Sequence, residues 1–75
     1  MLITLDALPQ GSTASVCSVR AEGSLRRRLL DFGLIEGTEI LCLRCARGIS
    51  LYKLRGTMLA LRKADGAKIC VELCV

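Results

Sequence analysis

The sequence predicts a mainly β protein: a small barrel of about five strands with one inserted α-helix. The chain has 75 residues, which suffices for one domain, and we expect residues 1–75 to form it. Four consecutive segments in the second half have the composition of short strands and are separated by turns that contain glycine. One stretch before them carries apolar residues at helical spacing. Five short strands cannot bury both faces as a flat sheet, whereas a barrel removes the edges and encloses one core.

The first half of the chain is predicted to hold one strand and the helix. Residues 13–20 have a β-type composition and form the expected strand. Ser24 has the side chain of a good N-cap, so we expect the helix to begin there. Leu25, Leu29 and Phe32 then follow at the spacing of one helical face.

Glycines mark the turns that follow. Gly33 is expected to end the helix as a C′ glycine, and Glu36-Gly37 to form the centre of a tight turn. The predicted strands of the second half are residues 38–45, 49–55, 57–63 and 68–74. The breaks between them are Arg47-Gly48, Gly56 and the turn Ala64-Asp65-Gly66.

Composition argues for a protein that binds a partner and does not cross a membrane. The longest unbroken apolar runs are four residues, against the roughly 20 that a membrane helix requires. Residues 1–11 lack a basic segment and carry Asp6 in their apolar stretch, so we expect no signal peptide and a cytoplasmic location. The mean hydropathy of +0.48 is high for a small soluble domain and indicates apolar surface available to a partner. With one Phe, one Tyr and no Trp, the chain lacks the stacking residues of single-strand nucleic-acid binders, and we expect no nucleic-acid partner.

No pattern in the sequence indicates an enzyme. Histidine, the commonest general base, is absent. Asp6, Asp31 and Asp65 are spread over separate segments and form no carboxylate pair. A nucleophilic thiol or hydroxyl requires an adjacent base, and none is offered. We therefore expect neither catalysis nor a cofactor.

The five cysteines raise the question of a metal site. Without an export signal disulfides are disfavoured, and Cys17 and Cys42 are expected to pack as small apolar residues. Cys42 and Cys45 are three apart in a predicted strand, so their side chains should diverge. Cys70 and Cys74 share a face but lie roughly 13 Å apart along a strand, too far for one ion. We expect no metal site, and the ligands to test against this expectation are Cys70, Cys74 and Cys45.

Three blocks of sequence carry a resemblance to a known family. Residues 26–38, RRRLLDFGLIEGT, resemble the RRLxxLGxxxGxxI signature of the ferrous-iron transport protein A (FeoA) family. Residues 55–62, RGTMLALR, are similar to that family's later RGxxLALR block. Residues 5–11 match the opening of the family pattern, while Ile69 and Val71 match its closing strand.

The resemblance implies an SH3-like barrel with an inserted helix, and a role in iron transport through protein–protein interaction. Members of the family are small cytoplasmic accessories of a ferrous-iron permease that carries its own GTP-binding domain. The implied partner is thus the cytosolic part of that transporter, with the membrane reached only through it. Two alternatives stay open: a stand-alone regulatory module related to the C-terminal domain of metal-dependent repressors, and a thiol-based protein that binds transition-metal ions.

Two departures from the family pattern concern loops. Many relatives carry a proline-containing loop where this chain has Cys45-Ala46-Arg47-Gly48-Ile49-Ser50. Gly66 stands where relatives often have alanine in a short helical turn.

The run Arg26, Arg27 and Arg28 is one candidate for partner binding. Three cations in the first turn oppose the helix dipole, at a cost of about 0.3–1 kcal/mol each at most. Because nothing local offsets this cost, a binding role is one interpretation; a solvated face is the other.

Leu41 and Leu43 are the second candidate. Alternation places Ile40 and Cys42 on one face of the predicted strand and Glu39, Leu41 and Leu43 on the other. Glu39 should face water, so the two leucines would form an exposed pair on the barrel wall. In the alternative, the helix covers them and makes a second small core.

Overall fold

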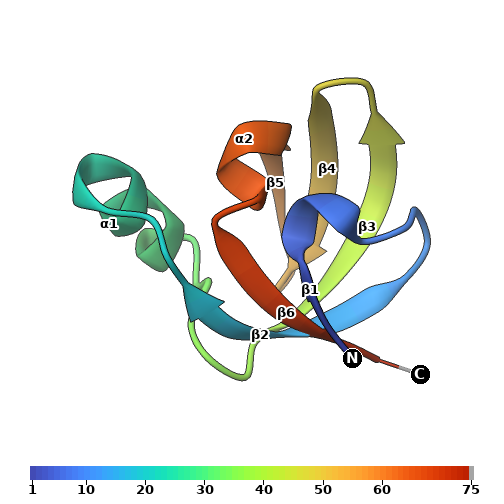
Figure 1. Ribbon diagram of the computed structural model, residues 1–75, viewed down its shortest axis with the longest axis horizontal. Helices are drawn as coiled ribbons and strands as arrows, with labels where there is room; N and C mark the ends of the chain where they lie inside the picture. The colour runs from blue at the N-terminus through green and yellow to red at the C-terminus, as the bar shows by residue number, and fades with distance from the viewer. Residues whose placement is uncertain (75) are drawn as a thin grey trace.

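The computed structural model describes residues 1–74, and in these the sheet has six antiparallel strands that curl around one core (Figure 1). The spatial order is β1-β6-β2-β3-β4-β5. The strands are β1 (Leu2–Thr4), β2 (Thr13–Val19), β3 (Glu39–Ala46), β4 (Ile49–Leu54), β5 (Thr57–Arg62) and β6 (Ile69–Leu73). The helical elements are the 3₁₀ turn η1 (Leu5–Ala7), the helix α1 (Gly23–Asp31) and the short helix α2 (Lys63–Gly66).

This architecture confirms the predicted mainly β fold with a helix inserted after the first long strand. Each predicted strand is present, and no end of a strand differs from its predicted bound by more than one residue. Two elements were not predicted: β1, with only three residues, and η1 directly after it. β1 is held by β6, from the other end of the chain, through pairs such as Ile3 opposite Val71. Figure 1 shows β1 and β6 side by side as a result.

The start of α1 corrects the predicted N-cap. Glu22 is the extended residue before the helix and makes no side-chain capping bond, and Ser24 already lies in the first turn. The end agrees with prediction: Gly33 has φ of +95°, and the Leu34 amide donates to the Leu29 carbonyl at 3.1 Å. A left-handed glycine with such a backward bond is a common way to end a helix. No helix in residues 1–74 combines the length and apolar character needed to cross a bilayer.

α2 replaces the predicted Ala64-Asp65-Gly66 turn and packs on η1. Gly66 is buried there, and a β-carbon at this position would lie 3.2 Å from the Asp6 backbone nitrogen. The close approach of the two backbones favours glycine at this position.

The core combines inward side chains of the strands with residues from η1 and α1. Ile40 and Cys42 are both fully buried, as the alternation predicted. Tyr52 lies beneath them on β4, and its hydroxyl donates to the Leu5 carbonyl at 3.2 Å. The fully buried large side chains are Tyr52, Leu5, Leu8, Leu29, Leu34, Ile40, Leu54, Ile69, Val16, Val71 and Cys42.

A β-bulge in β3 changes the faces of its second half. Cys42 pairs with Tyr52, but the next pair joins Arg44 to Leu51, so Leu43 is the extra residue. Simple alternation along residues 38–45 is therefore wrong beyond Cys42. Leu41 and Leu43 are half-buried rather than an open pair of leucines.

Candidate functional site

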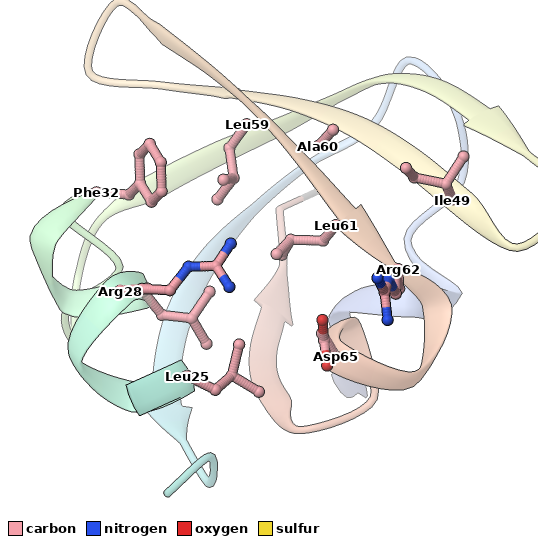
Figure 2. Close-up of a pocket in the computed structure, with 10 residues that line it drawn as sticks. Leu25, Arg28, Phe32, Ile49, Leu59, Ala60, Leu61, Arg62 and Asp65 are labelled. Atoms are coloured by element: carbon pink, nitrogen blue, oxygen red, sulfur yellow. The ribbon is translucent and has the colours of Figure 1, made fainter. Parts of the chain in front are cut away.

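A cleft of about 230 Å³ separates α1 from the outer strand of the barrel (Figure 2). Its size falls below the 300–1,000 Å³ of pockets that enclose small ligands, so it is better suited to side chains of a docked segment. The lining residues come from α1 and its end, from β4, from β5 and from α2: Leu25, Arg28, Leu29, Phe32, Ile49, Leu59, Ala60, Leu61, Arg62 and Asp65.

The inner surface of the cleft is apolar. Leu59 and Leu61 point from β5 toward α1, whereas Ala60 between them points away (Figure 2). Leu29, from α1, is buried against the same core. Phe32, at the end of α1, remains 39% exposed at the cleft mouth. Apolar surface that is presented in a concave site favours binding of apolar groups from a partner.

Charged side chains stand at the rim. Arg28 reaches from α1 into the cleft, and Arg62 and Asp65 lie at the opposite end (Figure 2). Within residues 1–74 the salt bridge present joins the amino terminus to Glu72, so neither arginine is paired with a carboxylate. The guanidinium groups are thus available to an anionic partner group, for which their planar fork is well suited.

The structure separates the three predicted arginines. Arg26 donates from its guanidinium Nη1 to the Val19 carbonyl at 2.8 Å and so ties the first turn of α1 to β2. Arg26 and Arg27 border a shallow hollow with Leu30 on another side of the helix. Only Arg28 of the three lines the cleft.

The two predicted leucines lie elsewhere. Leu41 borders a hollow whose lining comes from β2, β3, β4 and their turns, with no residue of α1. The alternative in which the helix covers Leu41 therefore finds no support. Leu43 is the extra residue of the bulge in β3. The β5 residues of the cleft were not identified from the sequence, although the alternation in residues 57–62 predicts that Leu59 and Leu61 face the same side.

The predicted orientation of Cys42 and Cys45 needs a correction. Cys42 pairs with Tyr52 and Cys45 with Ser50, and these two partners lie on the same face of β4. Because of the bulge, Cys42 and Cys45 therefore share a face, and the predicted divergence is wrong. Burial raises the pKa of the Cys42 thiol, and the neighbouring Cys45 adds to this rise.

The other thiols are distributed over the sheet. Cys17 is half-buried, and burial followed by the nearby Cys70 raises its pKa. In the described part of the chain, no cluster of three or more Cys, Asp or Glu side chains is arranged to hold a metal ion. The absence of a tight metal site in solution stays a prediction.

Comparison with known proteins gives the family. A family model described as the FeoA domain matches residues 3–73. A Fe(2+) transport protein A/Fe(2+) transporter FeoB fusion protein from Porphyromonas gingivalis is 35% identical over 71 residues. That match covers 92% of this chain but only 8% of the length of the fusion protein.

Solved structures share the fold over nearly the whole chain. The FeoA protein from Chlorobium tepidum is 33% identical with a TM-score of 0.90, covering 97% of this chain and 71% of that one. Zinc-complexed FeoA from Stenotrophomonas maltophilia, described as a procaryotic SH3 domain protein, is 29% identical with a TM-score of 0.83, covering 93% and 89%.

A manganese-dependent transcriptional repressor also superposes, with a TM-score of 0.88 over 97% of this chain and 42% of its own. At 17% identity this likeness shows the fold alone. The SH3-like barrel implied by the sequence is confirmed, and, on the family model and the fusion relative, the chain belongs to the FeoA domain family.

Proposed function

We propose that this protein is a cytoplasmic accessory of ferrous-iron uptake that binds the cytosolic, GTP-binding part of a FeoB-type transporter. The observation that carries the proposal is the fusion relative, in which an FeoA part and a FeoB part share one polypeptide. Covalent linkage raises the effective concentration of two modules that interact. A separate chain of the same family must achieve the same association through its own surface.

The cleft between α1 and β5 is the surface that best fits this role. It combines buried leucines, the exposed ring of Phe32 and the unpaired guanidinium of Arg28. Interfaces gain most of their binding energy from such apolar and arginine anchors. The other predicted contacts, Arg26, Arg27, Leu41 and Leu43, lie outside it and stay candidates for a wider footprint.

Calorimetry with the cytosolic domain of the transporter from the same organism tests the proposal, with and without guanine nucleotide. We expect binding in the micromolar range or tighter. Arg28→Glu should weaken it about tenfold or more, because the reversed charge faces the partner's anionic group. Arg20→Glu is the matched control, since it makes the same charge change at an exposed position outside the cleft and outside the other candidate contacts. Absence of association at tens of micromolar in every nucleotide state would contradict the proposal.

A regulatory module is the second candidate, since the fold is shared with the manganese-dependent repressor. Deleting the gene separates the two. An accessory lowers iron uptake at unchanged transporter abundance, whereas a regulator changes that abundance.

A further inference from the structure

β5 forms one edge of the sheet. In the described chain its only strand neighbour is β4, and the sheet order ends with it. The two strands are joined by the two-residue turn Arg55-Gly56, whose φ values of +50° and +76° are typical of a tight hairpin. An edge strand carries a row of backbone donors and acceptors with no sheet partner.

The register identifies which groups these are. Leu54 faces Thr57 across the turn, and the Lys63 amide donates to the Gly48 carbonyl at 2.9 Å on the same ladder. In an antiparallel pair, alternate residues direct their N–H and C=O groups to opposite sides. Leu59 and Leu61, in phase with Lys63, therefore bond to β4.

Met58 and Ala60, out of phase with that ladder, direct their backbone groups away from β4. Among residues 1–74 no backbone hydrogen bond from another segment reaches the amide or carbonyl of either residue. The free edge at Ala60 also borders the cleft, with α1 as the opposite wall (Figure 2).

We propose that the cleft binds an extended segment of the partner as an additional strand on β5. The backbone of that segment would bond to Met58 and Ala60, and α1 would cover its inner face. Main-chain pairing with an exposed sheet edge is a general mode of peptide recognition, in which alternate side chains give the specificity. The inference rests on the proposed function, because the transporter's cytosolic part supplies the segment.

The side chains along the cleft define the chemistry of the segment. Residues opposite Leu59 and Leu61 point inward, as those leucines do, and meet Leu25 and Phe32 on the helix side. They should be apolar and two positions apart. Arg28 and Arg62 give the lining two cations against the one carboxylate of Asp65, so a nearby acidic residue completes the match.

Charge also argues against a second copy of this chain as the occupant. β5 itself, TMLALR, contributes Arg62 and no carboxylate. Edge-to-edge pairing of two β5 strands would bring no acidic side chain from the strand to the cleft arginines. Self-association is therefore an outcome of the test that would count against this proposal.

Backbone hydrogen exchange on the full chain, free and bound to the transporter's cytosolic domain, tests the mode of binding. In the free protein the amides of Met58 and Ala60 should exchange quickly, and those of Leu59 and Leu61 slowly. Binding should slow Met58 and Ala60 by about tenfold or more while leaving the alternate amides unchanged. This alternating pattern is specific to strand addition.

A proline substitution tests the same backbone contact by removing its donor. Ala60→Pro removes the free amide, and proline is tolerated at an edge position whose N–H faces away from the neighbouring strand. We expect it to weaken binding about tenfold or more. The control is Leu2→Pro on β1, the opposite edge, where the Met1–Leu73 bond places the Leu2 amide on the outer side; binding should change less than about twofold. If Ala60→Pro does not fold, the exchange pattern decides alone.

The outcomes separate the two proposals. Tight binding without protection of Met58 and Ala60 overturns strand addition and leaves the accessory function in place. Protection of these amides at high protein concentration without the transporter domain would assign the edge to a second copy. Absence of any binding overturns the accessory function, and this inference with it.

Discussion

The hydroxyl of Tyr52 donates a 3.2 Å hydrogen bond to the carbonyl oxygen of Leu5 and so joins the middle of β4 to the 3₁₀ turn after β1. The two residues are 47 positions apart, and both are buried. The contact fixes the N-terminal segment on a barrel in which only β2, β3, β4 and β5 are neighbours in chain order.

Tyr52→Phe tests the energetic weight of this bond. It removes one of two donors to the buried Leu5 carbonyl, which keeps the Leu8 amide at 3.0 Å, so we expect a loss of about 0.5–1.5 kcal/mol in the free energy of unfolding. Urea denaturation measures the change. An unchanged midpoint would mean that the bond from the Leu8 amide alone satisfies the carbonyl.

Alkaline pH should destabilise the protein through its buried acids. Burial raises the pKa of the Cys42 thiol above its ordinary value of 9.0, and also that of the Tyr52 phenol above 10.0. The unfolded chain therefore loses these protons first, so stability is complete below about pH 9 and declines as the pH rises toward the folded-state pKa values.

The free energy of unfolding measured between pH 7 and 11 checks this direction. In Cys42→Ala the decline that begins at about pH 9 should be shallower, because one of the two thiols with a raised pKa is removed while Cys17 and the Tyr52 phenol remain. Stability that rises with pH over this interval would contradict the assignment.

Ile40→Lys and Leu41→Lys compare the two faces of β3. Ile40 is fully buried, and a lysine there buries an unpaired charge, so the variant should lose more than about 3 kcal/mol and fail to fold. Leu41 is only half-buried, so Leu41→Lys should cost about 1 kcal/mol, part of it from repulsion by Lys53, its partner across the strands. Thermal melting followed by circular dichroism distinguishes them. Equal damage from both would show that Leu41 belongs to a second core.

Titration with Fe(II) and Zn(II) tests the expected absence of a tight metal site. We expect no stoichiometric binding at sub-micromolar affinity for the reduced protein. The informative variants are Cys70→Ser, Cys74→Ser and Cys45→Ser, compared with wild type. A tight site that one of these substitutions abolishes would refute the expectation and favour the thiol-based alternative.

Local sequence was sufficient to predict most of the barrel. Gly33, Gly37 and Gly56 all adopt the positive φ that their predicted turns require. The prediction that Ile40 and Cys42 face the core is also confirmed, because burial of one face fixes the register of a strand.

The errors arise where distant segments determine the structure. β1, with three residues, is held in the sheet by its pairing with β6. The cleft was missed for the same reason. It exists because α1 faces the edge of β5, and no spacing within either element encodes that arrangement.

The extra residue at Leu43 separates two parts of the third strand that are each in regular register with β4. Before it, odd-numbered side chains face outward; after it, Arg44 and Ala46 do, opposite Leu51 and Ile49. Deleting that one residue would restore plain alternation with the same faces, Arg44 outward and Cys45 inward, and would remove only the local bend that a bulge adds. The strand should therefore tolerate a single-codon deletion at the bulge, whereas the same deletion at Leu41 would place the adjacent Ile40 and Cys42 on opposite faces.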